Sequence, residues 1–334
     1  MIGNDVAVFL TVDTETSIGG AFRDARLHPV GYEKRVYGLF KGRAFGISLM
    51  MEIAEKYGIR LTFFVETLAS HVFGLKPLHK VVQSILQRGH DVQLHLHPNY
   101  RTFERSTRQQ EPESDFMHAY SVSEQKAMLE DGVETLHRCG VPRVSAFRAG
   151  CYGADESTVE AMRTLGLVVD SSYNAAHLGA ECGFQNRSIN DVWRWNGGVF
   201  ELPVSCFHDR SFLGKRLRPL DINGTGFGEA KDFLQKAYAA GTRCVVVVLH
   251  SFSFIKPYDV QYTRVRIRYN VIRRFRRLCA YLRQNRDKFS VHTVGEWSLS
   301  DLKHAAEKAV HQVPSVSPVY SWARLVEQAW DRWV

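Results

Sequence analysis

The segment from Gly89 to Pro98, GHDVQLHLHP, contains the pattern from which the fold of the whole chain can be predicted. Apolar and polar residues alternate through it, which predicts a strand with one apolar and one polar face. Gly89 ends the helical pattern before this strand, as a helix C-cap often does. His95 and His97 fall on the polar face and point the same way. Because imidazole is a common zinc ligand, this strand end could hold a metal ion; a polar edge that faces water is the alternative.

The same succession recurs along the chain: a helical pattern, then a glycine, then an apolar strand. Strands are expected at residues 6–13, 60–66, 91–97, 144–148, 167–172, 199–205, 244–250 and 289–294. Helices are expected near residues 43–57, 76–88, 123–138, 154–165, 227–240, 262–285 and 296–311. This alternation is typical of an α/β protein whose parallel strands are joined by crossover helices. Because no repeat or linker divides the chain, we expect a barrel over 1–298 and a helical extension over 299–334 that packs on the barrel or on a partner.

The composition is that of a globular protein. The chain has 334 residues, of which 45% are hydrophobic and 23% charged, and this length suits one α/β barrel. A net charge of +8 allows anionic partners, but no nucleic-acid recognition motif is present. The six cysteines form no CxxC pair, the N-terminus has no basic leader pattern, and no apolar run approaches the roughly 20 residues that span a bilayer. We therefore expect a soluble cytoplasmic protein with reduced thiols.

Ionisable residues gather where the expected strands end. One such residue is usually a buried core histidine or a capping aspartate, and means little alone. In parallel α/β folds, however, functional sites assemble at the carboxyl ends of the strands. Seven ionisable residues at these ends therefore predict a functional site. They are Asp13, Glu15, His95, His97, Arg148, Asp170 and His250.

An ordered set of short motifs resembles the polysaccharide deacetylases, the NodB-like carbohydrate esterases. The resemblance runs from about residue 5 to residue 298 and implies a distorted (β/α) barrel of about seven parallel strands. It also implies metal-dependent removal of an acyl group, usually N-acetyl, from an amino sugar. The motifs are TVDTE (11–15), LTFFVE (61–66), GHDVQLHLH (89–97), FRAGCYG (147–153), DSS (170–172) and VVLHS (247–251).

The resemblance implies a set of metal ligands. In the family, the second acidic residue of the first motif binds the metal, but Thr14 stands at that place here. Glu15 is the expected ligand instead. His95 matches the first histidine of the family's HxxxH motif, and Asn99 stands where the second would be. We expect His97 to replace it, because residues i and i+2 of a strand face the same side, and Asn99 is the alternative. The expected cofactor is one divalent ion, with zinc as the first choice.

The resemblance also implies roles for three catalytic groups. Asp13 would be the general base, and Arg148 would pair with it and keep it ionised. The backbone around Tyr152 would supply an N–H group to the developing oxyanion.

His250, in VVLHS, would protonate the leaving amine. A general acid needs an orienting partner, and Asp170 is the expected one, with Glu201 as the alternative. Hydrolysis of an amide requires such a proton because an unprotonated amine is a poor leaving group.

The expected function is a metal-dependent hydrolase that removes an N-acyl group from an amino sugar in polysaccharide or glycolipid biosynthesis. The sugar could be free, polymeric, or linked to a nucleotide or a lipid. A deformylase or another amide hydrolase on a carrier-linked sugar is one alternative. A carbohydrate-binding pseudoenzyme is the other, suggested by Thr14 and by the incomplete HxxxH motif.

Two segments outside these motifs have more than one interpretation. Residues 264–277, RVRIRYNVIRRFRR, could be a solvated helix face or a docking patch for phosphate, which fits the planar fork of arginine. Residues 319–334 place apolar side chains at helical spacing. This stripe is expected to pack on the barrel or on a second subunit, and contact with a membrane interface is the alternative.

Overall fold

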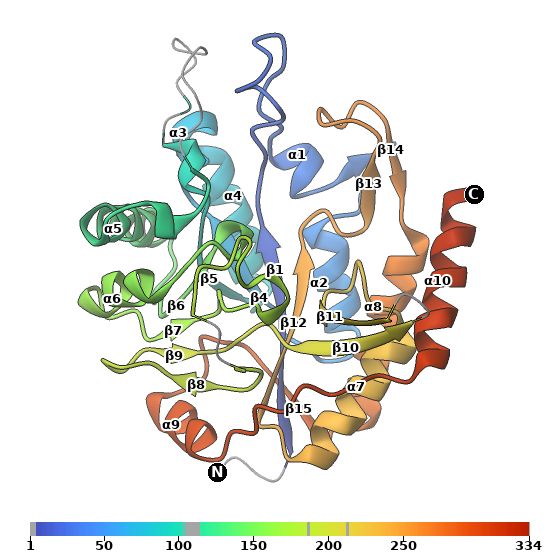
Figure 1. Cartoon of the computed structure of the whole chain (residues 1–334). Helices are drawn as coiled ribbons and strands as arrows, with labels where there is room; N and C mark the ends of the chain where they lie inside the picture. Colours follow the sequence, from blue (N-terminus) through green and yellow to red (C-terminus); the bar gives the residue numbers. More distant parts are fainter. Residues whose placement is uncertain (1–4, 102, 104–113, 186–187, 212–213, 334) are drawn as a thin grey trace.

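The computed structural model describes residues 5–101, 103, 114–185, 188–211 and 214–333. In this part of the chain, nine strands form one curled sheet in the order β12-β1-β4-β5-β6-β7-β9-β8, with β15 also paired to β1 (Figure 1). Eight of these strands run parallel, and only β8 is antiparallel to its neighbour. The strands are β1 (Val6–Thr14), β4 (Thr62–Glu66), β5 (Asp91–Leu96), β6 (Ala146–Ala149), β7 (Val169–Asp170), β8 (Trp193–Arg194), β9 (Phe200–Glu201), β12 (Cys244–His250) and β15 (Phe289–His292).

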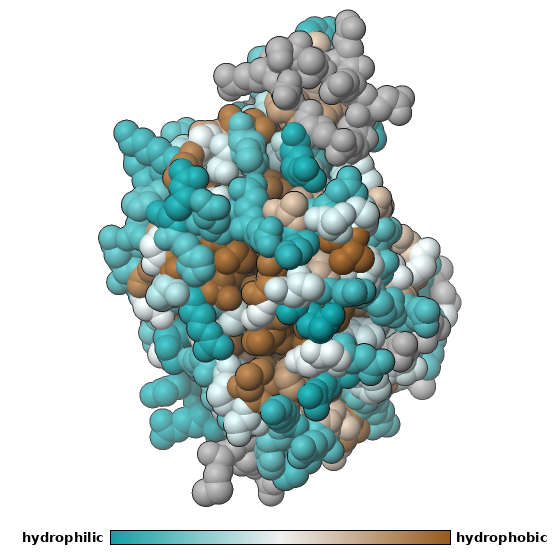
Figure 2. Space-filling model, turned by 90° about the vertical axis from the view of Figure 1, so that its left-hand side faces the viewer, coloured by the Kyte–Doolittle hydropathy of each residue, from teal (hydrophilic) through white to brown (hydrophobic). Residues whose placement is uncertain are grey.

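Helices cover the outside of this sheet, so the predicted alternation of strands and crossover helices is confirmed (Figure 1). The face that carries α5 and α6 shows apolar side chains between hydrophilic ones (Figure 2). The helices are α1 (Tyr32–Arg35), α2 (Ile47–Glu55), α3 (Ser70–Phe73), α4 (Leu75–Leu86), α5 (Val122–Arg138), α6 (Glu156–Thr164), α7 (Phe227–Ala240), α8 (Tyr269–Gln284), α9 (Leu299–Glu307) and α10 (Pro318–Trp333).

Local sequence signals set the helix ends. Ser121 caps α5 by accepting a hydrogen bond from the Glu124 N–H, and Glu124 accepts one from the Ser121 N–H in return. Gly89 and Gly241, which follow α4 and α7, have φ angles of 73° and 78°, a conformation that glycine adopts without steric cost. The predicted glycine stops are thus confirmed at both places.

The alternation of β1 separates two cores. Leu10 and Val12 pack outward with the helices, whereas Ala7 and Phe9 belong to a second apolar cluster inside the curl. Asp13 shares the parity of Ala7 and Phe9, so the same alternation turns its carboxylate into the barrel. The apolar strand therefore places a charged group in the interior only at its carboxyl end.

The amino end of the barrel is closed by the segment after β15. Val294 and Trp297 join the inner apolar cluster, and so do Leu302 and Ala305 of α9. Figure 1 shows α9 at the lower end of the barrel, away from the carboxyl ends of the strands. The interior is therefore closed at one end, and access is from the other.

Helix α10 lies against the barrel through buried ion pairs. Arg324 is 2.7 Å from Asp209 and 2.9 Å from Glu229, and Arg274 of α8 is 2.7 Å from Glu327. Several apolar side chains of α10 face solvent instead: Val319, Trp322, Leu325 and Val326. Among the described residues, no helix has both the length and the apolar character required to cross a membrane.

The helix predicted over 262–285 is wrong in its first part. Residues 255–257 and 265–267 form an antiparallel hairpin, β13 (Ile255–Pro257) with β14 (Val265–Ile267), and α8 begins at Tyr269. The reason is the sequence of 264–268, RVRIR, in which charged and apolar residues alternate with the period of a strand. Two further hairpins, β2 (Leu39–Phe40) with β3 (Arg43–Ala44) and β10 (Cys206–Ser211) with β11 (Gly214–Pro219), were not predicted.

Candidate active site

The carboxyl ends of the parallel strands bring the predicted polar residues together at the open end of the barrel. In the strand register, Asp13 lies opposite His250 and His95 lies opposite Arg148. Asp170 ends β7, the next strand of the sheet. The register that joins these strands therefore sets the spacing of the side chains.

Glu15, His95 and His97 form a compact group of ligand atoms. The Glu15 Oε2 atom is 2.6 Å from His97 Nε2 and 3.4 Å from His95 Nε2. One ligand atom from each of the three residues lies within 4.8 Å of the others. The predicted ligand set is thus assembled in space, from the end of β1 and the end of β5.

The hydrogen bonds around this group suit a cation. The His95 Nδ1 atom lies 2.7 Å from the Arg148 carbonyl oxygen, which can only accept, so Nδ1 carries the proton. In the neutral ring, Nε2 then turns a lone pair toward the Glu15 carboxylate. Two acceptors that face each other require a proton or a cation between them. Two imidazole nitrogens and a carboxylate oxygen are a donor set that zinc accepts.

Thr14 and Asn99, the two departures from the family motifs, lie beside this group. The Thr14 hydroxyl donates to the Val12 carbonyl at 3.2 Å, and strand parity turns this side chain away from Asp13. Asn99 lies in the short 3₁₀ turn Pro98–Tyr100, and its N–H group donates to Asp115 at 3.4 Å. Glu15 therefore supplies the carboxylate that the position of Thr14 lacks.

Two residues that support the group were missed by the sequence analysis. Asp115 accepts a hydrogen bond from His97 Nδ1 at 2.8 Å, and Arg35 forms an ion pair with Glu15 at 2.6 Å. A carboxylate on the far nitrogen of a ligand histidine fixes the orientation of its ring. No sequence motif marked Asp115 or Arg35.

The electrostatics of this group are strongly coupled. Burial alone would raise the pKa of Glu15, but His97, His95 and Arg35 outweigh it and hold this pKa well below its usual value. Burial alone would lower the pKa of His97, but Asp115 and Glu15 outweigh it and raise this pKa well above its usual value. Opposite charges thus hold the carboxylate of Glu15 ionised at the barrel mouth.

Asp13 and Arg148 form a buried ion pair, with 2.7 Å between Oδ1 and Nη1. The Arg148 side chain is 0% exposed and also donates to Thr11 and to both oxygens of Ser171. Its guanidinium carbon lies 4.3 Å from the centre of the Phe64 ring. All three guanidinium nitrogens thus donate hydrogen bonds, which fix Asp13 Oδ1 and leave Oδ2 without a bond to Arg148.

His250 faces that second oxygen. Its Nε2 atom is 4.0 Å from Asp13 Oδ2, too far for a direct hydrogen bond. Its N–H group donates to Ser253 Oγ at 2.9 Å, which fixes the backbone at the strand end. The His250 Nδ1 atom is buried and has no hydrogen-bond partner in the part of the chain that the structure describes. The imidazole therefore stands beside Asp13 with space between the two groups.

Asp170 and Glu201 lie opposite each other on β7 and β9 and bind each other. Asp170 also accepts from the Ser172 hydroxyl at 2.6 Å, and Glu201 accepts from the Tyr173 N–H at 3.0 Å. One of these two residues was expected to orient His250. Within the described ranges, however, neither carboxyl group forms a hydrogen bond with it. The two carboxyl groups are engaged instead with each other and with hydroxyl, indole and backbone groups of their own segment.

These two carboxyl groups are fully buried, and they share protons. Burial raises the pKa of Asp170 to about 6, although hydrogen bonds from its neighbours oppose the shift. Burial and the charge of Asp170 raise the pKa of Glu201 well above its usual value. Two carboxylates this close cannot both ionise readily.

Tyr152 lies in an unusual stretch of backbone. Cys151 and Tyr152 have φ angles of 53° and 59°, a left-handed conformation that is uncommon outside glycine. Such residues cost about 1–3 kcal/mol each and tend to persist at functional sites. Burial raises the pKa of the Tyr152 phenol well above its usual value, and the Asp13 carboxylate adds to this effect. The predicted oxyanion segment thus lies within the electrostatic reach of Asp13.

Comparisons with known proteins agree with this architecture. No protein-family model and no curated protein matches the chain. Among solved structures, a protein from Mycobacterium smegmatis that is named as a polysaccharide deacetylase aligns with a TM-score of 0.56 at 15% identity, over 93% of this chain and 94% of that one. A family 4 carbohydrate esterase from Streptomyces lividans aligns with a TM-score of 0.43 at 12% identity, over 93% and 98% of the two chains. A peptidoglycan deacetylase from Bacillus subtilis aligns with a TM-score of 0.40 at 10% identity, over 91% and 94%.

The first of these similarities shows that the chain has the fold of a NodB-like polysaccharide deacetylase. The predicted fold class, a distorted (β/α) barrel, is therefore confirmed. At this level of identity the similarity concerns the fold, and the chemistry has to be argued from the side chains.

The first prediction concerns the buried ion pair. Replacement Arg148→Met should lower the free energy of unfolding by about 3–5 kcal/mol, because it leaves the Asp13 carboxylate buried without its partner. Arg26→Met is the control: Arg26 pairs with Asp24 at 2.8 Å, but its side chain is 90% exposed, so stability should hardly change. Urea unfolding measures both. Equal effects of the two replacements would contradict the structural role of Arg148.

The second prediction concerns Asp170 and Glu201. Their pKa values are raised in the folded protein, so the stability that their protonated form contributes is present below about pH 4 and is lost as the pH rises through about 6. Asp170→Asn, which cannot titrate, should flatten this fall in the free energy of unfolding. Urea unfolding at several pH values between 4 and 7 measures the slope. An unchanged slope would show that the pair does not share protons.

Proposed function

We propose that this protein is a metal-dependent hydrolase that removes an N-acyl group, N-acetyl in the first place, from an amino sugar. The observation that carries the proposal is the arrangement at the barrel mouth. A donor group of Glu15, His95 and His97 lies beside Asp13, which is fixed by Arg148 and faced by His250. These are the parts that amide hydrolysis requires: an ion site, a base and an acid.

Glu15, His95 and His97 would hold the ion. Lewis acidity, which polarises a carbonyl and makes water more acidic, is the chemistry that a divalent ion supplies in such a site. Asp115 and Arg35 contribute by fixing two of these ligands, His97 and Glu15, in place.

Asp13 acts as the general base. Its Oδ1 atom is engaged by Arg148, so Oδ2 is the atom that accepts the proton from the attacking water. Because Arg148 is fixed on all sides, Asp13 stays in position while this proton moves, and the cost of reorganisation is small.

His250 acts as the general acid. It approaches from β12, on the side of β1 opposite to β4 and β5, and its side chain is 23% exposed. From there it can give a proton to the nitrogen that leaves the acyl carbon. The backbone at Tyr152 is the proposed donor to the oxyanion, and its left-handed conformation, uncommon outside glycine, supports a functional role for this segment.

The third prediction tests the ion site. His95→Ala and His97→Ala should each reduce bound zinc from about one ion per chain to a small fraction and abolish acyl release, because two ligands rarely retain zinc. Asn99→Ala is the matched control and should keep both the ion and the activity. Metal analysis and acetate release from a panel of N-acetylated sugars measure the outcome, with circular dichroism as the check on folding. Zinc that stays in His97→Ala and is lost from Asn99→Ala would assign the third ligand to Asn99.

The fourth prediction separates the acid from the ligands. His250→Ala should retain the ion but lose amide hydrolysis by roughly 10²–10⁴-fold, which is the usual contribution of a general acid. Hydrolysis of an activated aryl ester, whose leaving group needs no proton, should fall much less. Both rates and the metal content are measured on the same preparation. Equal losses on the two substrates, or loss of the ion, would refute this role.

A further inference from the structure

A basic cavity of about 390 Å³ lies beside the candidate active site. It lies on the hairpin β13–β14 and on the loop that follows His250. Three of its lining residues are the cations Lys256, Arg266 and Arg268, and none of the lining residues described is a carboxylate. The cavity therefore has the charge of an anion site.

The cavity and the candidate active site share a wall. Phe252 lines the cavity, and its ring centre is 5.2 Å from that of His250. The Arg35 guanidinium lies 3.7 Å from the centre of the same Phe252 ring and 2.6 Å from Glu15. Tyr262, a further lining residue, accepts a hydrogen bond from Arg35 at 2.7 Å. A molecule bound at the candidate active site could therefore extend a neighbouring substituent into the cavity.

The hairpin places like charges against each other. Lys256 lies directly opposite Arg266 in the antiparallel register, and Arg268 follows two residues later on the same side. Like charges in opposite positions of a strand pair destabilise it. An anion that binds beside Lys256 and Arg266 would reduce this repulsion.

Arg268 is held in position by its neighbours. Its guanidinium donates to the Asn223 side-chain oxygen at 2.6 Å, and Asn223 in turn donates to Ser253 Oγ at 3.0 Å. The same Ser253 oxygen accepts the N–H of His250. One chain of hydrogen bonds thus links a cation of the cavity to the backbone of the proposed general acid.

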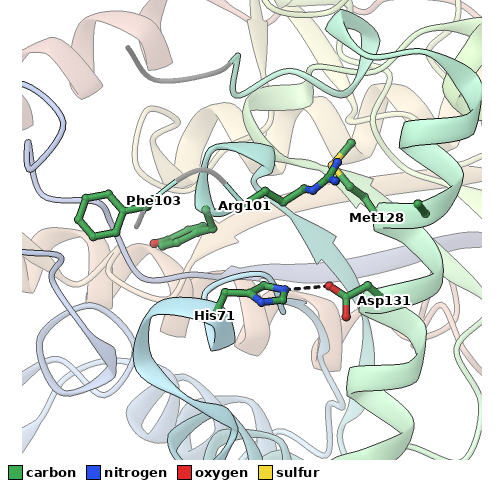
Figure 3. Close-up of a pocket in the computed structure, with 7 residues that line it drawn as sticks. His71, Arg101, Phe103, Met128 and Asp131 are labelled. Carbon is green, nitrogen blue, oxygen red and sulfur yellow. Dashed lines mark hydrogen bonds and ion pairs between the residues drawn. The ribbon is translucent and has the colours of Figure 1, made fainter. Parts of the chain in front are cut away.

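A second cavity shows the contrast. It has a volume of about 460 Å³ and lies between α3, α5 and the turn after β5 (Figure 3). There His71 pairs with Asp131 at 2.9 Å, and Arg101 lies near a carboxylate and apolar side chains. The charged residues that line this cavity are of both signs, so it has no excess of cations.

We propose that the basic cavity binds the phosphate or diphosphate of a carrier to which the amino sugar is attached. Arginine forks match the oxygens of phosphate in geometry and charge, and three cations suit a multiply charged group better than a single carboxylate. The statement about the sugar rests on the proposed function. The statement about phosphate rests on the cavity alone.

Inorganic pyrophosphate is the probe for the fifth prediction. Calorimetric titration of EDTA-treated protein excludes binding through an ion at Glu15, His95 and His97. The double replacement Lys256→Ala and Arg266→Ala should weaken pyrophosphate binding at least tenfold. Arg264→Ala, at a residue that precedes β14 and lines a different cavity, is the control and should bind as the unaltered protein does. Equal affinity in all three proteins, or no binding to the unaltered protein, overturns the proposal.

The nature of the carrier is tested with uridine diphosphate and farnesyl diphosphate in the same titration. Tighter binding of the nucleotide supports a nucleotide carrier, and tighter binding of the prenyl compound supports a lipid carrier. If both bind more weakly than pyrophosphate, the cavity does not accept a carrier-linked phosphate and that part is refuted. A protein that binds pyrophosphate but releases no acyl group would refute the proposed hydrolase alone.

Discussion

The buried contact between Arg148 and Asp13 is the interaction on which the site depends. It joins β6 to β1, two strands that are separated in the sheet by β4 and β5, so it crosses the interior of the curled sheet. The same guanidinium binds Ser171 just after β7. A single side chain thus connects three strand ends, and the relative positions of the proposed base, acid and ion ligands follow from that connection.

The second constraint is the balance of charge at the barrel mouth. Asp13 is buried and the Glu15 side chain is only 11% exposed, so each requires a cation nearby, because a buried carboxylate without one is costly. Arg148 binds Asp13 through Oδ1 and Arg35 binds Glu15 through Oε1, so the second oxygen of each carboxylate is left to other partners: Oε2 of Glu15 faces His95 and His97, and Oδ2 of Asp13 faces His250. In each carboxylate, therefore, one oxygen binds the arginine that compensates its charge, and the other oxygen faces a histidine of the candidate site.

Much of the fold and part of the site could be predicted from the sequence. Strand parity correctly placed His95 and His97 on one side and brought them to Glu15, because the period of a strand is fixed by its backbone. Asp115 and Arg35 could not be found in this way, since they come from segments whose path depends on the tertiary fold. Asp170 was expected to orient His250, but among the described residues its side chain binds Ser172 and Glu201 instead, for a related reason. Position along the chain shows which end of a strand a residue occupies, but the neighbour it meets depends on strand order, and that order placed Glu201 there.

The position of β1 has a consequence for biosynthesis. This strand, VAVFLTVDT, is synthesised before the other strands of the sheet, yet it pairs with β12 and β15, which lie within residues 244–292. Contacts of such long sequence separation form slowly, and an apolar strand without its neighbours is prone to association with other chains. The barrel cannot close around its central strand until β15 has been synthesised. Production of the protein in cells should therefore depend on chaperones that shield the nascent amino-terminal segment.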